Sequence, residues 1–530
     1  MSNKYQTSIG SFTRKSTFFW ASVGATVGLA NLWQFPHLAS IHGGGLFVLI
    51  YLVCLLLVAL PLMVTETVIG RYSRHGIVLA MDGLVKNAGC SPWWRLAGPL
   101  SILAAFLVLS FTAVFGGIVL AYIFFGAAGS FSGATTVEAT EILADFVSSS
   151  GRYREFMGWH AFFLVLVVWV SARGVVNGVE RSLRMIVPAA LLLLLALFVL
   201  SASHGRLGSG VESILAIRPE DVSFDSIRAA FFHAFYTLGL GMGVWAVFGA
   251  YSTSHTHLKR SIVAVVLMDT LVAIIAGMMM FSVPSDGSNL QGEHGFGLLF
   301  VSLPVTLAQV PYSQVVITAV FLAVLLIVWA TAISLLEPVV ASFREWTGAP
   351  RGWSVIIVGT AVWFVGLASL FSFNVWSEYR LAGATAFRWL ELLTGGVLIP
   401  LVAILIATFT GYCLTRRFSA GMLGNAPVAF RKSWYWTMRL VLPVIVAWIG
   451  VQYTAFSLSN LCENGGSALW CSENESTAVQ SLPEFEPAVG AGPEVEAGSS
   501  VPASAKPEAG PGVNADDSAP KGDDILYHSV

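Results

Sequence analysis

The chain has 530 residues, of which 56% are hydrophobic and 11% are charged, and its mean hydropathy is +0.75. A soluble globular protein of this length does not need so much apolar surface, so the composition excludes that class and indicates a polytopic membrane protein. The net charge of −2 is unevenly distributed. Residues 457–530 hold twelve acidic residues and two lysines, a net of −10, which leaves +8 on the rest.

The hydrophobic pattern predicts an all-α protein with about eleven transmembrane helices, which we number as spans 1 to 11. The predicted spans are residues 16–39, 44–70, 96–126, 157–173, 182–203, 227–251, 259–283, 313–343, 353–372, 388–415 and 433–456. Residues 286–312 are expected to form a short helical hairpin over the outer face. From about residue 457, Pro, Ala, Gly, Ser and Glu dominate, which predicts a disordered acidic C-terminal tail over 457–530.

Lysine and arginine gather on one side of the predicted membrane. Nineteen lie in loops on the side of the N-terminus and seven in the opposite loops. The protein is predicted to lie in the cell (inner) membrane. Because positive residues favour the cytoplasmic side, the N-terminal segment 1–15 is predicted to be cytoplasmic. Eleven spans then place the C-terminal tail outside the cytoplasm. There Cys462 and Cys471 could pair as a disulfide, and whether they are bonded is left open.

Two spans are interrupted by glycines at the depth where lipid is expected. Span 1 contains GATVGLANL at 24–32 and span 6 contains YTLGLGMG at 236–243. Glycine costs about 1 kcal/mol in a helix, and an unpaired backbone group in hydrocarbon costs several more, so the freed groups should face protein, water or solute. Breaks at matching positions of two oppositely inserted halves are typical of an inverted repeat. The alternative is that these glycines only allow close helix packing.

Five motifs together resemble the neurotransmitter:sodium symporter family: GATVGLANLWQFP, HGGGLFVLIYL, PLMVTETVIGRY, YTLGLGMG and ISLLEP. The resemblance covers residues 10–456. It implies a transporter domain over 16–456 with the LeuT-type fold, a 5+5 inverted repeat with broken helices 1 and 6. Repeat one would span about 16–203 and repeat two about 227–415. The implied activity is sodium-coupled symport of a small solute by alternating access.

The resemblance also implies a first sodium site, formed by the Thr26 carbonyl and the side chains of Asn31, Thr237 and Asp269. The family usually has Asn at position 269. An acid at mid-membrane is costly, so it should be paired or functional. Here it would neutralise the bound cation, and chloride would then not be required. The alternative is a protonated, hydrogen-bonded acid.

A second sodium site would use the carbonyls of Gly24, Val27 and Ile327 and the hydroxyl of Thr331. Ala330 stands where the family has a second hydroxyl. One sodium ion is therefore expected, and sodium binding at this second site is left open.

Gly28 occupies the position at which amine-transporting relatives carry Asp, which predicts a substrate that brings its own carboxylate, an amino acid. The N–H groups of Leu29 and Ala30, with the half-helix dipoles, would hold that carboxylate. Gly239 and Met242 stand where Ser and Phe are common, which predicts a roomy apolar pocket for a bulky or apolar side chain. The implied pocket lining is Val108, Thr112, Tyr236, Thr237, Gly239, Met242, Thr331 and Leu335.

Both implied gates depart from the family pattern. On the outside, Gln34, His233 and Glu391 are expected to form one hydrogen-bonded set. Histidine titrates near neutral pH, so closure could depend on pH, or His233 could simply be a solvated residue. On the inside, Tyr251 and Glu345 match the family's gate. The arginine that the family has near its N-terminus falls at Ile9 here, so Lys4, Arg14 or Lys15 would have to replace it. Glu66 and Glu337 are expected to tie helices together.

We therefore expect a secondary active transporter, not an enzyme. The sequence has no paired-carboxylate cleft, nucleophile with a base, ATP-binding loop or nucleic-acid signature. The alternative is a transporter-derived receptor that binds solute without completing a transport cycle, and an ion channel is disfavoured. The particular amino acid and the oligomeric state are left open.

Overall fold

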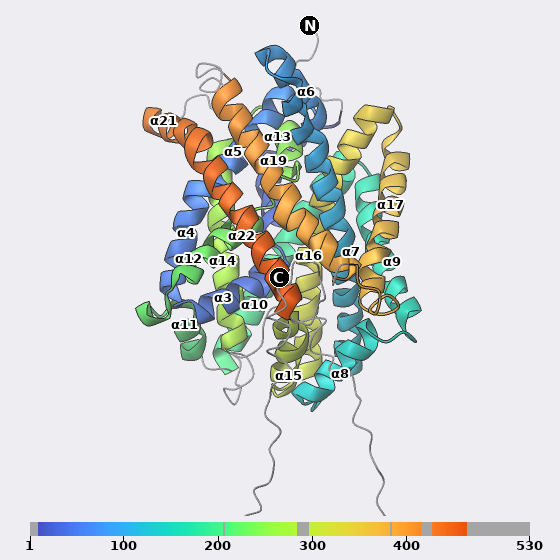
Figure 1. Cartoon of the computed structure of the whole chain (residues 1–530). Helices are drawn as coiled ribbons and strands as arrows, with labels where there is room; N and C mark the ends of the chain where they lie inside the picture. The colour runs from blue at the N-terminus through green and yellow to red at the C-terminus, as the bar shows by residue number, and fades with distance from the viewer. Residues whose placement is uncertain (1–8, 205–206, 283–295, 382–383, 415–426, 464–530) are drawn as a thin grey trace, which may run out of the picture.

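The computed structural model describes residues 9–204, 207–282, 296–381, 384–414 and 427–463. All the spans are helical, and they form one elongated bundle (Figure 1). The helix α1 begins at the face that carries the N-terminus, which we call the N-terminal face. In Figure 1 the helices α8 and α15 lie at the opposite end.

Among the described residues, nine helices are long and apolar enough to cross a membrane. They correspond to nine of the predicted spans. These are Gly45–Ser73, Pro92–Ala128, Tyr153–Ala172, Val175–Ser203, Leu258–Phe281, Ser313–Thr347, Arg351–Ser372, Ala386–Cys413 and Val428–Ala455. The two other predicted spans, 1 and 6, are the ones with the glycine motifs, and each is divided into shorter helices.

The divided spans and the connections have the following bounds. Span 1 consists of α1 (Lys15–Thr26), α2 (Leu29–Leu32) and α3 (Gln34–Ile41), and span 6 of α12 (Phe224–Thr237) and α13 (Val244–Tyr251). The connecting helices are α6 (Ile77–Ala88), α8 (Thr136–Val147), α11 (Leu207–Leu215), η4 (Pro219–Asp221), η5 (Leu298–Ser302) and α15 (Leu303–Ala308). The described part of the predicted outer hairpin, residues 296–312, contains this last pair, which together form one buried apolar helix. The rest of that prediction lies outside the described residues.

Several continuous spans contain wider π-helical turns. Span 2 is α4 (Gly45–Cys54), η1 (Leu55–Ala59) and α5 (Leu60–Ser73), and span 5 is η3 (Val175–Glu180) and α10 (Arg181–His204). Span 10 is α18 (Ala386–Glu391), η6 (Leu392–Leu398), α19 (Ile399–Thr408) and η7 (Phe409–Cys413). Span 11 is α21 (Val428–Trp436), η8 (Thr437–Val441) and α22 (Leu442–Glu463), so it ends later than predicted. Such turns are frequent at functional sites.

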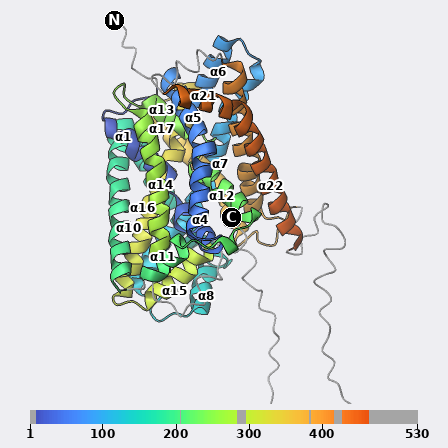
Figure 2. The same cartoon turned by 90° about the vertical axis from the view of Figure 1, so that its left-hand side faces the viewer.

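The remaining spans are single helices: η2 (Pro92–Leu96) with α7 (Ala97–Ala128) is span 3, and α9 (Tyr153–Ala172) is span 4. Spans 7, 8 and 9 are α14 (Leu258–Phe281), α16 (Ser313–Thr347) and α17 (Arg351–Ser372). The helices α7 and α16 pack along each other over much of their length. In Figure 2, α10 and α22 lie at opposite sides of the bundle.

Spans 2 and 6 are packed backbone to backbone. A Cβ added at Gly70 of α5 would lie 1.7 Å from the carbonyl oxygen of Ala246 in α13. A Cβ at Gly249 of α13 would lie 2.1 Å from the carbonyl oxygen of Thr67. Small residues allow helices in membranes to approach this closely. The two glycines therefore fix α13 against span 2.

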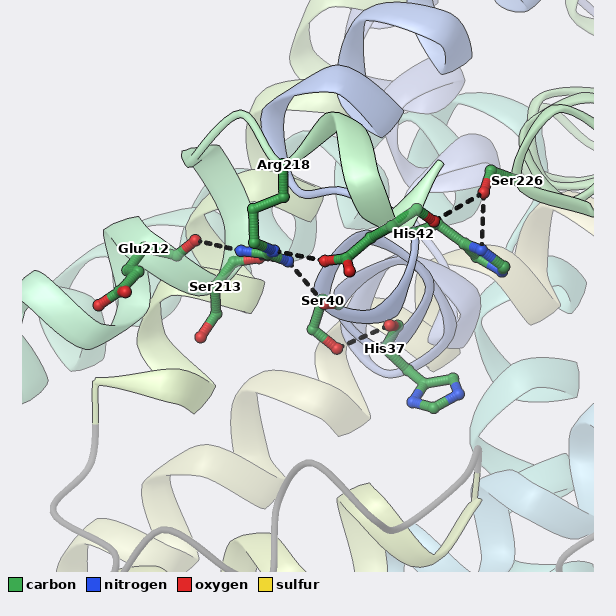
Figure 3. Close-up of polar contacts among 8 residues, drawn as sticks. His37, Ser40, His42, Glu212, Ser213, Arg218 and Ser226 are labelled. Atoms are coloured by element: carbon green, nitrogen blue, oxygen red, sulfur yellow. Dashed lines mark hydrogen bonds and ion pairs between the residues drawn. The ribbon is translucent and has the colours of Figure 1, made fainter. Parts of the chain in front are cut away.

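The end of span 1 is held by the connection between spans 5 and 6 (Figure 3). The Arg218 guanidinium donates hydrogen bonds to the carbonyl oxygens of Ser40 at 2.7 Å and Glu212 at 2.8 Å. It therefore links the C-terminal turns of α3 and α11. The turn between α3 and α4 uses Gly44, whose φ is +60° and whose Cβ would lie 2.3 Å from the Ala216 carbonyl oxygen. His42 contacts Ser226 of α12 at 3.0 Å. The glycines of the HGGG motif therefore allow the backbone of this turn to approach the Ala216 carbonyl oxygen closely.

Candidate functional site

The break in span 1 opens the helix for two residues at mid-span. The helix α1 ends at Thr26, and Gly28 is extended with φ −129° and ψ −169° before α2 begins at Leu29. The Gly28 N–H donates to the Asn31 side-chain oxygen at 3.0 Å, which closes the start of α2. Leu29 and Ala30 lie in that first turn, where N–H groups have no intrahelical acceptor.

The break in span 6 is longer and depends on three glycines. The helix α12 ends at Thr237 and α13 begins at Val244, while Gly239, Gly241 and Gly243 all have φ between +60° and +74°. The buried carboxylate of Glu66 in span 2 accepts a hydrogen bond from the Gly241 N–H at 2.8 Å. The predicted role of Glu66 in tying helices together is confirmed, since it stabilises the unwound segment.

Three of the predicted first-sodium-site side chains meet between the two breaks. Asp269 of α14 is fully buried. It accepts hydrogen bonds from the Asn31 amide at 3.0 Å and from the Thr237 hydroxyl at 3.3 Å. The Thr237 hydroxyl also lies 3.4 Å from the Asn31 side-chain oxygen. The Thr26 carbonyl oxygen lies 3.8 Å from the position of a Cβ on Gly28. Oxygen atoms from spans 1, 6 and 7 thus converge in one place.

Tyr51 of span 2 completes this cluster and was not anticipated. Its hydroxyl donates to Asp269 at 3.1 Å, and its ring packs 5.2 Å from Phe35 and 5.3 Å from His233, measured between centroids. The residue lies inside the motif HGGGLFVLIYL, but that motif is apolar on every side. Only the rotation of the helix shows that this one hydroxyl points inward.

The predicted second-site residues also meet. The Thr331 hydroxyl of α16 lies 3.1 Å from the carbonyl oxygens of Gly24 and Val27 and 3.2 Å from that of Ile327. A hydroxyl can donate only one hydrogen, so three carbonyls share a single donor. Ala330 offers only its methyl, which lies 3.1 Å from the position of a Cβ on Gly24.

Four of the predicted substrate-pocket residues lie at the break in span 6 or at the helix end before it: Tyr236, Thr237, Gly239 and Met242. The terminal methyl of Met242 lies 3.3 Å from the position of a Cβ on Gly239. The Tyr236 hydroxyl is directed to span 10, where it donates to the Gly395 carbonyl oxygen at 2.5 Å. The other lining residues lie on the paired helices α7 and α16, Val108 and Thr112 on the first and Leu335 on the second.

The predicted outer gate is divided into two separate contacts. His233 lies 3.3 Å from the Gln34 side-chain oxygen, as expected. The Glu391 carboxylate instead accepts hydrogen bonds from Arg388 at 2.6 Å and from the Tyr453 hydroxyl at 3.2 Å. Glu391 lies on span 10 with Arg388 one turn before it, so its ion-pair partner is on the same helix.

An aromatic cluster lies just after the break in span 1, on the side of α3. Trp33 packs against Phe115 of α7 and Phe296, with ring centroids 6.3 and 5.8 Å apart, and Phe115 lies 5.8 Å from Phe387 of span 10. Trp33 and Phe296 are buried. The sequence contains many aromatic residues near span ends, and nothing in it distinguishes these four.

The predicted inner-gate residues do not meet each other. The Tyr251 hydroxyl donates to Glu337 at 2.8 Å, whereas Glu345 contacts His75 at 2.9 Å and the Gly76 N–H. The two acids are eight residues apart on α16, about two helical turns, so one tyrosine cannot reach both.

Glu337 ties several helices together at the N-terminal face. Besides the Tyr251 hydroxyl, its carboxylate accepts hydrogen bonds from Ser171 at the end of α9 and from Arg351 at the start of α17. The prediction that Glu337 ties helices together is confirmed.

Glu180 of η3 holds the start of span 1. Its carboxylate accepts hydrogen bonds from the Thr13 N–H at 2.7 Å, the Arg14 N–H at 3.1 Å and the Thr17 hydroxyl at 2.7 Å. These contacts satisfy backbone donors at the beginning of α1, and a carboxylate is favourable at a helix N-terminus. No sequence motif linked positions 13 and 180.

The family model described as the sodium:neurotransmitter symporter family matches residues 10–141 and 138–462, and the chain belongs to this family. An uncharacterized sodium-dependent transporter, YhdH of Bacillus subtilis, is 31% identical over 82% of this chain and 95% of its own length. An uncharacterized sodium-dependent transporter of Haemophilus influenzae is 24% identical over 82% of this chain and 96% of its length. The crystal structure of MhsT in complex with L-phenylalanine has a TM-score of 0.74 and 29% identity, covering 84% of this chain and 99% of MhsT.

Because it belongs to this family, the chain is a sodium-dependent membrane transporter of a small molecule and not an enzyme. The predicted LeuT-type architecture with broken helices 1 and 6 is confirmed by the two interrupted spans and by the likeness to MhsT.

Proposed function

We propose that this chain imports an apolar or bulky amino acid together with sodium. The observation that carries the proposal is the cluster of Asn31, Thr237 and Asp269 between the two breaks. Its amide, hydroxyl and carboxylate oxygens are hard ligands of the kind that alkali and alkaline-earth cations prefer. Sodium bound there would lie beside the unwound backbone at Gly28, where a substrate carboxylate could reach both the ion and the N–H groups of Leu29 and Ala30.

An amino acid is favoured over a simple amine because Gly28 carries no acid to pair with an amino group. MhsT, to which this chain is 29% identical, was crystallised in complex with L-phenylalanine, which supports an aromatic or aliphatic amino acid as the substrate here. The pocket lining of Val108, Tyr236, Met242 and Leu335 is compatible with an apolar side chain.

We further propose that chloride is not required and that one sodium ion is bound firmly. The Asp269 carboxylate lies within the first cluster and supplies the negative charge that an added anion would otherwise provide. At the second cluster, Thr331 is a single hydroxyl among three carbonyls, which supports a weaker ion site or a bound water.

The orientation remains the one that the charge distribution favours, with the N-terminal face in the cytoplasm and the C-terminal tail outside. The division into a cytoplasmic segment 1–15, a transporter domain 16–456 with two inverted halves, and a tail 457–530 also remains a prediction. Cys471 and most of the tail lie outside the described residues.

The test is uptake by the full chain in proteoliposomes. Tritiated phenylalanine, tryptophan, leucine, valine, alanine and dopamine are each offered with sodium, lithium or choline outside, in chloride and in gluconate. We expect sodium-dependent uptake of at least one of the three largest amino acids, equal in both anions. Transport of dopamine alone would refute the amino-acid proposal, and uptake only in chloride would refute the role of Asp269.

The alternative is a receptor that binds solute without moving it. Two observations favour it: Ala330 lacks the second hydroxyl of an ion site, and the Glu391 carboxylate of the predicted outer gate contacts Arg388 and Tyr453 instead of Gln34 and His233. Sodium-dependent counterflow separates the two functions. Exchange of internal unlabelled for external labelled amino acid shows a transporter, whereas saturable binding without exchange shows a receptor.

A further inference from the structure

Span 11 carries a tyrosine that reaches the site from outside the two repeats. Tyr453 of α22 points between span 10 and span 6, and its hydroxyl lies 3.2 Å from the Glu391 carboxylate. Its ring centroid lies 5.8 Å from that of Tyr236 on α12. The residue thus contacts both the acid of the predicted outer gate and a residue of the predicted substrate pocket.

The acid at this position is already neutralised within its own helix. Arg388 and Glu391 are one turn apart on α18, the nitrogen and oxygen are 2.6 Å apart, and both side chains are largely buried. A charge pair this close on one helix needs no partner from span 1. Gln34 of span 1, which stands where the family has an arginine, contacts His233 instead. The charge pair therefore does not bridge the two sides of the outer pathway.

The pathway is bridged instead by two tyrosine hydroxyls, from spans 6 and 11, that each bind span 10. Tyr236 donates to the Gly395 carbonyl oxygen in the π-helical turn η6, and Tyr453 donates to Glu391 one turn earlier on span 10. The approach of the last span is close, because a Cβ on Gly395 would lie 3.1 Å from the Tyr453 ring. Spans 6, 10 and 11 are thereby joined at one level.

We propose that Tyr453 is a positioning residue of the substrate site. Its hydroxyl fixes the Glu391–Arg388 pair and its ring supports Tyr236, so that span 11 takes part in closing the outer side of the site. This inference rests on the proposed function, since it assumes that substrate binds beside Tyr236.

The experiment compares Tyr453→Phe, which removes only the hydroxyl, with a matched change on the same span. Tyr435→Phe also removes a tyrosine hydroxyl that contacts a charged group, Arg439 at 2.9 Å, away from the site. Uptake of tritiated phenylalanine, tryptophan and leucine is measured in proteoliposomes against substrate concentration, with the unfolding temperature of each variant in detergent. We expect Tyr453→Phe to raise KM about 5- to 10-fold with the maximal rate changed less than twofold, and Tyr435→Phe to leave both unchanged.

A purely structural role would lower the unfolding temperature and the maximal rate while leaving KM alone, and that result would overturn the proposal. Glu391→Gln and the double variant Glu391→Gln/Tyr453→Phe test the route of the effect. If Tyr453 acts through Glu391, the double variant is no worse than Glu391→Gln, and additive losses would contradict that route. Arg388→Gln, which acts on the other side of the carboxylate, should show the same rise in KM. If wild-type protein transports none of the three amino acids, the proposed function fails first, and the role of Tyr453 fails with it.

Discussion

Asp269 is a fully buried carboxylate with three donors around it, from spans 1, 2 and 6. We predict that Asp269→Ala lowers sodium-dependent uptake at least tenfold, because the cation loses its one charged neighbour. Asp269→Asn keeps the shape without the charge and should make uptake depend on added chloride. Asp82→Ala removes a half-exposed acid that pairs with Lys86 and serves as the control. Wild-type uptake by Asp269→Ala would contradict the role assigned to this residue.

Gly28 offers a test in which space and charge can be separated. A Cβ at this position would meet only the Thr26 carbonyl oxygen at 3.8 Å and the Thr331 hydroxyl at 3.9 Å, which is ordinary contact, and φ is −129°. We therefore predict that Gly28→Ala folds normally and retains uptake within about threefold. Gly28→Asp should lose amino-acid uptake more than tenfold, because a carboxylate there repels that of the substrate. Equal uptake by both variants, measured with the transported amino acid, would show that the substrate binds elsewhere.

Single residues also show the limits of inference from sequence. The residues that meet around Asp269 and Thr331 could be predicted to lie together, because each matches a family motif at or beside a helix break. Tyr51, Glu180 and Tyr453 could not, since their partners are 218, 167 and 62 positions away and only the rotation of each helix decides what its side chain meets. For the same reason Glu391, expected beside Gln34 and His233, instead contacts Arg388 and Tyr453.

At the scale of elements, α1 depends on a carboxylate from another span. In Glu180→Gln the side chain keeps one acceptor oxygen, so one of the two backbone N–H groups of Thr13 and Arg14 loses its partner. A hydrogen bond to a charged group contributes about 1.5–3 kcal/mol, so its loss should be felt locally. We expect amide hydrogen exchange of residues 13–17 to become at least fivefold faster, while Glu141→Gln on the exposed face of α8 changes nothing there. Unaltered exchange in Glu180→Gln would mean that other contacts hold this segment.

The contact between α5 and α13 leaves no space for a methyl group. Gly70→Ala would place Cβ 1.7 Å from a backbone oxygen that cannot move alone, and overpacking of this kind costs about 1–3 kcal/mol or more. Gly83 of α6 has nothing within 4 Å of its Cβ position, so Gly83→Ala should be neutral or stabilising by about 1 kcal/mol. Thermal unfolding in detergent measures both. A Gly70→Ala protein as stable as wild type would show that the two helices can separate.

At the scale of the whole molecule, the number and order of the spans could be predicted from the hydrophobic pattern of the sequence. The interruptions of spans 1 and 6 could be predicted from their glycine motifs. The boundaries could not, since span 3 begins at Pro92 instead of 96 and α22 ends at Glu463 instead of 456. The π-helical turns in spans 2, 5, 10 and 11 have no signature in composition.

Orientation belongs to the same scale and rests on nineteen against seven basic residues. We predict that alkaline phosphatase fused after Val530 is active and that green fluorescent protein fused there is dark, because the charge distribution predicts a C-terminus outside the cytoplasm. Fusions after Gly174, between spans 4 and 5, should give the reverse result. Fluorescence from the C-terminal fusion would place that end in the cytoplasm and reverse the topology.

The unwound segment of span 6 is anchored unequally. Glu66 binds it at Gly241, and Gly70 and Gly249 leave α13 no gap from span 2. By contrast, α12 contacts span 10 through the Tyr236 hydroxyl, span 11 through aromatic rings and span 2 through the side chains of α4. The half of span 6 nearer the N-terminal face is therefore fixed directly to the backbone of span 2. A rotation between the two halves of span 6 would have to use the segment from Leu238 to Gly243, where three glycines already have positive φ.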